Sequence, residues 1–273
     1  MSVREDPKKQ TYDFVYDEFD SPVMRRVRTE AYGEDIGQHS WVTARDLRGD
    51  IDRLRLAPSH HLLDVGCGPC GPLTYVLHAI GCRGTGLDLS GEAVAVGRRR
   101  AASLGLDALS TIEQADLNCP LPLENASFDA AMSLDVVLHV RDRGALFREI
   151  ARVLTPGGRF LFTDAGVLVG VISDDEVASR SLHGHTHFVA PGFNERALQD
   201  AGFRLLETED RTESLLLNAE GRRAARLAHR ADVEHAEGAD VFAHEQHYLE
   251  TVIALARRRS LSRMMYLAES HGR

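Results

Sequence analysis

The sequence contains very little lysine, few cysteines and no long apolar run. Lys8 and Lys9 are its only lysines while arginine is abundant, which we interpret as codon bias. Four cysteines in 273 residues are too few for a disulfide scaffold and suit a cytoplasmic protein. No apolar run approaches the roughly 18 residues of a membrane span, and the charged N-terminus lacks the apolar core of a signal peptide. We therefore expect a cytoplasmic protein that has no membrane partner.

An excess of basic residues is absent too. The formal net charge is −9 at pH 7, which argues against a nucleic-acid partner because phosphate binding needs a basic surface. A hydrophobic content of 43% and a charged content of 27% are typical of a globular protein, and the chain is long enough to bury a full core. We expect one elaborated domain, monomeric or homodimeric, whose partner is a small molecule.

The cysteines do not form a recognisable redox or zinc motif. Cys67-Gly-Pro-Cys70 looks like a thioredoxin-type pair, but Val65-Gly66 precedes it inside a glycine loop, where thiols serve as small fillers. No second CxxC pair or spaced Cys/His pair completes four zinc ligands. The sequence thus predicts no metal site at these thiols.

Three histidines alternate along one segment. His183, His185 and His187 would share one face of a strand. No carboxylate or cysteine at ligand spacing supports a metal there, so we expect these histidines to line a substrate cavity.

The most informative stretch runs from His61 to Pro72 and reads HLLDVGCGPCGP. Its apolar run predicts a buried parallel strand, glycines follow at positions 66, 68 and 71, and a helix is expected to start there. Glycine lets the backbone turn tightly and lets a ligand approach it, and a helix N-terminus offers free N–H groups. The next strand carries Asp88 near its end, where a carboxylate can accept hydrogen bonds from both ribose hydroxyls. The stretch predicts a site for a nucleotide-like ligand.

Two cofactors fit this loop. Gly66-x-Gly68-x-x-Gly71, with Asp88 about 20 residues further on, matches the fingerprint of a nicotinamide or flavin dinucleotide site. S-adenosylmethionine fits as well, since it has a ribose and an adenine but no pyrophosphate. The loop alone leaves both open.

Strand and helix signals alternate along the chain. Residues 1–58 are expected to be mostly helical, and residues 165–190 to be irregular. Strands are predicted near 61–66, 84–89, 110–115, 127–134, 158–164, 203–211 and 261–268. Helices are predicted near 71–80, 91–104, 143–154, 193–201, 215–231 and 241–258. This alternation predicts an α/β fold with a parallel sheet and helices on both faces.

Further signals follow the glycine loop in a fixed order. Asp116 ends the third predicted strand, where a carboxylate can accept a hydrogen bond from the exocyclic amine of adenine. Taken together, the signals resemble class I S-adenosylmethionine-dependent methyltransferases over about residues 30–210. The motifs that carry the resemblance are Asp64-x-Gly66-x-Gly68, Asp88, Asp116, Phe128-Asp129 and Arg152-Val-Leu-x-Pro-Gly-Gly158.

The resemblance implies a Rossmann-like, seven-stranded, mostly parallel sheet with an antiparallel last strand. It also implies a helical N-terminal lid at residues 1–58 and a methyltransferase core at residues 59–273. A helical insertion at about residues 215–258 is expected before the last strand. S-adenosylmethionine is then the expected cofactor.

A narrower resemblance concerns the acceptor. Ser133-Leu-Asp135-Val-Val-Leu-His139 is similar to a block of phosphoethanolamine and glycine/sarcosine-type N-methyltransferases, and so is Gly33-Glu-Asp-Ile36. The phosphoethanolamine enzymes have a tyrosine where Ala165 stands, and their phosphate-binding tyrosines and lysine have no clear counterparts between 165 and 200. This departure favours another small amine or a natural-product acceptor.

Roles for individual residues follow from these resemblances. His139 is the candidate base or hydrogen-bonding partner of the acceptor, because an unperturbed imidazole pKa of about 6.5 suits that task. Asp135 and Asp164 are expected to orient a polar or cationic acceptor. Asp64 either braces the glycine loop or contacts the methionine amino group of the cofactor. The expected cofactor-binding residues are Ile36, Gln38, Asp64, Gly66, Gly68, Asp88, Leu89, Asp116, Leu117 and Leu134.

The sequence therefore predicts methyl transfer from S-adenosylmethionine to a small polar molecule, with an amine nitrogen as the main hypothesis. O- or C-methylation of a secondary metabolite is the alternative within catalysis. A dinucleotide-dependent oxidoreductase would need a catalytic Tyr/Lys or similar pair, and none is visible. A non-catalytic sensor of S-adenosylmethionine would predict loss of the acceptor-side polar groups, but Asp135, His139 and Asp164 are present.

Overall fold

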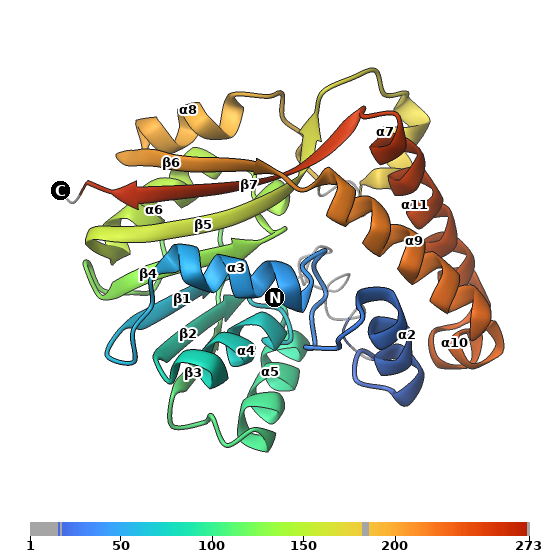
Figure 1. Cartoon of the computed structure of the whole chain (residues 1–273), viewed down its shortest axis with the longest axis horizontal. Helices are drawn as coiled ribbons and strands as arrows, with labels where there is room; N and C mark the ends of the chain where they lie inside the picture. Colours follow the sequence, from blue (N-terminus) through green and yellow to red (C-terminus); the bar gives the residue numbers. More distant parts are fainter. Residues whose placement is uncertain (1–15, 17, 182–185, 272–273) are drawn as a thin grey trace, which may run out of the picture.

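A seven-stranded sheet forms the centre of the molecule (Figure 1). The computed structural model describes residue 16, residues 18–181 and residues 186–271. The strand order is β3-β2-β1-β4-β5-β7-β6, and only β7 runs antiparallel to its neighbours β5 and β6. The strands are β1 His61–Val65, β2 Arg83–Asp88, β3 Ser110–Gln114, β4 Phe128–Leu134, β5 Leu154–Leu168, β6 Phe203–Asp210 and β7 Leu261–Ser270. The Rossmann-like fold predicted from the sequence is confirmed, with its antiparallel last strand.

Helices cover both faces of the sheet, because successive strand side chains point to opposite faces. Leu62 of β1 packs with α3 (Ala44–Leu54), α4 (Gly71–Ile80) and α5 (Gly91–Ser103). Leu63, the next residue, packs with α6 (Arg143–Val153) and α8 (Phe193–Asp200) on the other face. The continuous apolar run of β1 is therefore buried on both sides, as expected for a central parallel strand.

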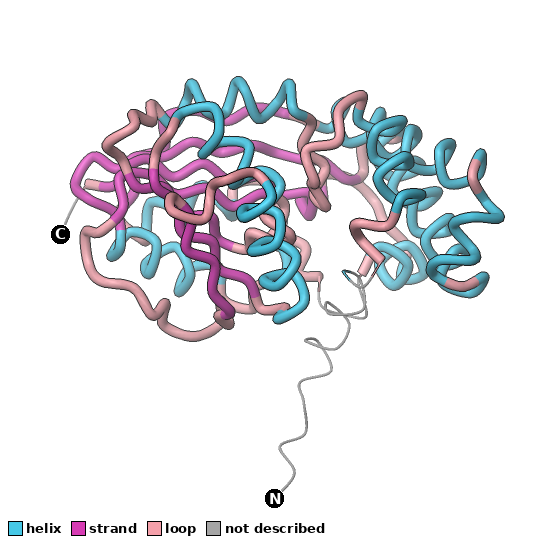
Figure 2. The backbone as a smooth tube through the Cα atoms, turned by 90° about the horizontal axis from the view of Figure 1, so that it is seen from below, coloured by secondary structure: helices cyan, strands magenta, loops and turns pink. Residues whose placement is uncertain are grey.

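A second group of helices gathers beyond the carboxyl ends of the parallel strands (Figures 1 and 2). Its members are α2 Pro22–Tyr32, α7 Asp174–Arg180, α9 Thr212–Ala228, α10 Arg230–Glu237 and α11 Ala239–Arg257. Val27 of α2 shares an apolar cluster with Ala225, Val233 and Phe242 of the other helices. The N-terminal segment and the insertion, far apart in the sequence, thus form one helical cover. The predicted domain division at residue 58 stays a prediction; α3, which precedes it, packs in the core of the sheet.

Two local expectations were wrong. The segment predicted as irregular contains α7, which starts with a capping box between Ser173 and Glu176. Strand β5 begins at Leu154 and not near 158, because the chain pairs with β4 as soon as α6 ends. Residues 155–158, with Gly157 at φ 79°, then form an irregularity in the pairing before the regular register resumes at Arg159. No described helix is long and apolar enough to cross a membrane.

Candidate functional site

A cavity of about 990 Å³ lies between the carboxyl edge of the sheet and the helical cover. The sheet contributes the loops after β1, β2, β3 and β4, and the cover contributes side chains of α2, α9 and α11. Most of its wall is apolar, and the polar groups include acidic, basic and uncharged side chains. Such a cavity at the carboxyl ends of parallel strands is where open α/β sheets bind ligands.

The glycine loop forms one end of this cavity. Gly66 N and Cys67 N donate to the carbonyl of Leu87 at 2.8 and 3.0 Å, which holds the loop against β2. Gly66 has φ 78°, and a side chain at this position would collide with Val136. The backbone therefore requires glycine here, for both conformation and space.

In a dinucleotide site the start of this helix faces the pyrophosphate. Here Gly71, the first residue of α4, faces the loop between α2 and α3 instead. A Cβ atom at Gly71 would collide with the backbone carbonyls of Ile36 and Gly37. The loop between α2 and α3 thus lies directly on the start of α4, where a pyrophosphate would otherwise bind. This close approach argues against a dinucleotide cofactor.

Three acidic residues face the cavity from successive strands. Asp64 of β1 is buried, and no described residue donates a hydrogen bond to its carboxylate; burial and the nearby Asp88 raise the pKa of Asp64 to about 8. Asp88 accepts hydrogen bonds from Gly68 N and Ser90 N at 2.8 and 2.9 Å. Asp116 accepts from the backbone and side chain of Asn118. Two of the carboxylates thus brace loops, whereas Asp64 would gain from a cationic ligand group.

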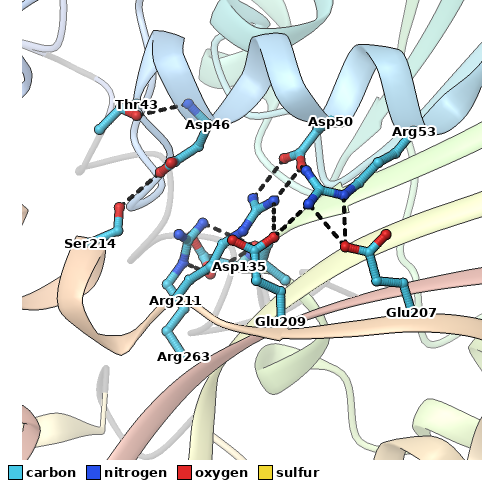
Figure 3. A network of polar contacts seen from close by, with 11 residues as sticks. Thr43, Asp46, Asp50, Arg53, Asp135, Glu207, Glu209, Arg211, Ser214 and Arg263 are labelled. Carbon is cyan, nitrogen blue, oxygen red and sulfur yellow. Dashed lines mark hydrogen bonds and ion pairs between the residues drawn. The ribbon is translucent and has the colours of Figure 1, made fainter.

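Asp135 lines the cavity and connects the cover to the sheet. It has φ 60°, an uncommon conformation for a residue other than glycine. Arg263 donates to its carboxylate at 2.9 and 3.2 Å (Figure 3). Thr163 Oγ1 and Trp41 N also donate to it, both at 2.9 Å. The contacts hold Trp41 against the end of β4.

Asp164 lies outside the cavity lining, which corrects its expected place beside an acceptor. Its side chain is fully buried in an ion pair with Arg143 at 2.5 Å. It also accepts hydrogen bonds from Asn194 Nδ2 and Gly166 N, both at 2.8 Å. Because these partners already satisfy both carboxylate oxygens, Asp164 connects β5 to α6 and α8.

Two histidines face the cavity near one another. His139 lies in the short helix η1 (Val137–His139), just after β4, and lines the cavity as predicted. His39, from the loop before α3, was missed; its side chain is exposed to the cavity, and desolvation by the surrounding walls together with the charges of Arg222, Arg28 and His139 lowers its pKa. His39 is therefore a neutral imidazole. Its neighbour Gln38 was predicted to bind the cofactor, so this loop was expected at the site, but no pattern singled out His39 itself.

The remaining predicted site residues are located as follows. Nine of the ten expected cofactor-binding residues line the cavity, and Ile36 does not, since it packs against α4 through its backbone. His187 is exposed and does not line the cavity, while His183 and His185 lie outside the described residues. Among the described residues, no group of three or more His, Cys, Asp or Glu side chains could hold a metal ion.

Four further cavity residues were not assigned to a site from the sequence. Trp41 lies in the loop before α3, and Arg180, Arg222 and Tyr248 lie on helices whose spatial neighbours the sequence does not reveal. All four line the part of the cavity formed by the helical cover.

Comparison with known proteins identifies the central part of the chain. Residues 63–162 match a family described as a methyltransferase domain. The chain is 33% identical to an O-methyltransferase of Pyrenophora dematioidea over 59% of this chain and 60% of that protein. It is 32% identical to a sarcosine/dimethylglycine N-methyltransferase of Halorhodospira halochloris over 59% of this chain and 57% of that protein. The chain thus spans about 60% or less of the length of these curated relatives.

A solved structure shares the whole architecture. Haemonchus contortus phosphoethanolamine N-methyltransferase 2, in complex with phosphomonomethylethanolamine and S-adenosylhomocysteine, superposes with a TM-score of 0.80 at 20% identity. The match covers 96% of this chain and 60% of that one, and at this identity it shows the fold alone. The family match, the relatives and the fold agree with one another: residues 63–162 form a methyltransferase domain, and the curated proteins that the chain resembles are methyltransferases.

Proposed function

We propose that the protein transfers a methyl group from S-adenosylmethionine to a small molecule, with an amine nitrogen as the main acceptor. The observation that carries the proposal is the cavity, which joins three strand-end carboxylates to a separate acceptor region under the helical cover. The relatives named above support the same chemistry, because they include N- and O-methyltransferases.

The cofactor end of the cavity suits the chemical groups of S-adenosylmethionine. We assign the methionine ammonium to Asp64, since this buried carboxylate accepts no hydrogen bond from the described residues. Asp88 is assigned to the ribose hydroxyls and Asp116 to the adenine amine, with Leu89, Leu117 and Leu134 packing around them. When bound, the cofactor supplies an electrophilic methyl group on a sulfonium.

The protein itself aligns the acceptor with the methyl group, excludes water and handles the proton of the acceptor. In-line displacement needs the nucleophile held close to the methyl carbon, which an enclosed cavity favours. His139 and His39 both line the cavity near one another, His139 just after the end of β4 and His39 in the loop before α3. We assign His139 to hold or remove the acceptor proton, and we assign Asp135 and Asp164 to position the walls around it.

O-methylation is the second candidate, and it is favoured because the similar proteins include an O-methyltransferase. His39 is a neutral imidazole that can accept a hydrogen bond from a hydroxyl, but its lowered pKa makes it a weak base and leaves proton removal to His139. A hydroxyl acceptor must lose its proton during transfer, whereas a neutral amine can attack with its proton still bound. Comparing matched amine and phenol acceptors therefore separates the two candidates.

Calorimetric titration with S-adenosylhomocysteine and with NAD tests the cofactor site. We expect S-adenosylhomocysteine to bind and NAD to give no signal. Asp88→Ala should weaken binding by about 1.5–3 kcal/mol, which is typical for loss of charge-assisted hydrogen bonds. Asp107→Ala removes an exposed carboxylate from a neighbouring loop and serves as the control. Binding of NAD alone would overturn the proposal.

The location and assembly of the protein stay predictions. A cytoplasmic protein, monomeric or homodimeric, with no nucleic-acid partner agrees with the four free cysteines and the acidic net charge.

A further inference from the structure

The acceptor region carries arginines, whereas carboxylates face the cofactor end. Four arginines line the cavity under the helical cover: Arg28, Arg180 and Arg226, which are buried, and Arg222, whose side chain is 16% exposed. A buried guanidinium is costly unless an anion or several acceptors meet its charge. The four arginines differ in how far this condition is met.

Two of the arginines pair directly with a carboxylate. Arg28 makes two hydrogen bonds to Asp35, at 2.8 and 3.1 Å, and one to the carbonyl of Phe19. Arg226 donates twice to the carboxylate of Glu237. These arginines hold the cover together, and neither needs a further anion.

Arg222 of α9 is less well compensated. The only carboxylate of a described residue within ion-pair distance belongs to Glu245, at 3.7 Å, which exceeds a hydrogen bond. Tyr32 lies beside Arg222, but burial raises the pKa of Tyr32, so it contributes no negative charge at neutral pH. Arg222 therefore presents a largely unmatched positive charge to the cavity.

Arg180 of α7 is in a similar position. Its side chain is almost completely buried, and no carboxylate of a described residue lies within ion-pair distance. Its Nη2 donates to the carbonyl of Ala165 at 3.0 Å, while its buried Nε has no partner. The remaining acid on this wall, Asp240, is exposed to solvent.

Two stacked aromatic rings connect these cations. Trp41 and Tyr248 lie at 6.4 Å between centroids with an interplanar angle of 17°. Arg222 lies 5.0 Å from the centroid of Trp41, and Arg180 lies 5.4 Å from that of Tyr248. An apolar ligand body can pack on the rings while its acidic group meets a guanidinium.

We propose that Arg222 and Arg180, with the Trp41–Tyr248 pair, form an acceptor subsite for an organic acid, in which a carboxylate or phosphate group is anchored on an apolar body. This inference rests on the proposed function, because it names the class of its acceptor. It also restricts the amine hypothesis: the nucleophile must be neutral or carried by a molecule that has an acidic group as well. A simple ammonium ion would lie beside two guanidinium groups and a sulfonium.

The subsite can be tested without knowing the natural acceptor, because Trp41 is the only tryptophan of the chain. Tryptophan fluorescence is titrated with benzoate, phenyl phosphate, benzamide and benzylamine, in protein saturated with S-adenosylhomocysteine. We expect at least one of the two anions to bind about tenfold tighter than benzamide, as one charge-assisted hydrogen bond predicts, and benzylammonium to bind weakest. The stronger of benzoate and phenyl phosphate identifies the acidic group.

Arg222→Gln should remove most of this preference, and Arg180→Gln should reduce it. Arg223→Gln is the matched control, since Arg223 is the next residue of α9 but pairs with Glu250 at the surface. If Arg222→Gln does not fold, Arg180→Gln provides the same comparison. Equal binding of benzamide and the anions, or an anion preference that survives in both folded variants, would overturn the inference.

Calorimetry with S-adenosylhomocysteine on the same samples keeps the two proposals apart. Binding of S-adenosylhomocysteine without an anion preference would contradict the acceptor subsite but would agree with the methyltransferase proposal. An anion preference that depends on Arg222 in protein that binds no S-adenosylhomocysteine supports the subsite and contradicts the proposed function.

Discussion

Asp64 is a buried carboxylate beside a second carboxylate, with no described hydrogen-bond donor. Burial and Asp88 raise its pKa to about 8, so near neutral pH the ligand-free protein carries a proton there. The unfolded chain releases this proton at about pH 4. The stability that the protonated group confers is therefore complete below about pH 4 and is lost as the pH rises through about 8.

This titration predicts proton release on cofactor binding. An ammonium group beside Asp64 favours the ionised carboxylate, so binding of S-adenosylhomocysteine at pH 7 should release up to about one proton. Calorimetry in two buffers with different ionisation enthalpies measures the number. Asp64→Asn should abolish the release and make the ligand-free protein more stable at pH 8. Equal proton release in both proteins would show that another group titrates.

His139 is expected to act on the acceptor and not on the cofactor. His139→Ala should lower turnover by about 10²–10⁴-fold, the usual contribution of general acid–base help, while affinity for S-adenosylhomocysteine changes little. His78→Ala, on the exposed side of α4, is the control. Turnover that falls less than about tenfold would indicate that alignment alone drives the reaction. Lost cofactor affinity would instead make His139 part of the cofactor site.

Single residues were predictable from the sequence where a strand end determines their position. Asp64 and Asp88 lie at the ends of β1 and β2, Asp116 and His139 come shortly after β3 and β4, and all four line the cavity. Asp164 was likewise expected at a strand end beside the acceptor. Its partners Arg143 and Asn194 come from helices, and no local sequence pattern reveals these contacts. His39 was missed for the same reason, because the charges that act on it come from Arg222 of α9 and Arg28 of α2 and not from its own segment.

At the scale of elements, the contact between the loop before α3 and the start of α4 closes the cofactor end. Gly71→Ala would force the added methyl group against the carbonyls of Ile36 and Gly37. We expect a loss of about 1–3 kcal/mol, typical of overpacking, together with weaker cofactor binding as the loop moves away.

Gly91→Ala provides a matched control for this change. Gly91 is the first residue of α5, and an added Cβ there meets only ordinary contacts near Gln114. Thermal unfolding and calorimetry of both variants give the comparison. Equal effects at the two positions would mean that the alanine acts through helix termini and not through the loop.

Elements with a strong periodic pattern were predictable, and the irregular ones were not. The helices α4, α5 and α6 begin and end within about a residue of their predicted bounds, since glycine and capping residues delimit them. Helix α7 was missed although Ser173-x-x-Glu176 is a capping-box pattern, because the three nearby histidines favoured a different interpretation.

At the scale of the whole molecule, a polar network attaches α3 to the far edge of the sheet (Figure 3). Asp50 of α3 accepts two hydrogen bonds from Arg211, which follows β6, and Arg53 binds Glu207 and Glu209 of β6. Asp50→Ala would leave the buried Arg211 guanidinium without its main counter-ion. We expect a loss of about 3–5 kcal/mol in the free energy of unfolding.

Urea unfolding measures this loss, with Asp52→Ala on the exposed side of the same helix as the control. The double change Asp50→Leu with Arg211→Met should recover part of the stability, since it removes both buried charges. A double variant that is less stable than Asp50→Ala would show that the pair contributes more than mutual neutralisation.

The packing of α2 on α9 and α10 restricts how the specificity for the methyl acceptor can change during evolution. The walls of the acceptor region are encoded in two stretches of the chain separated by the entire cofactor-binding half. A graft of the insertion alone would set a foreign α9 against the resident α2 and expose mismatched apolar surface. New acceptor preferences should therefore arise by paired exchange of both stretches, or by point changes confined to side chains that touch the cavity and not the seam between the helices.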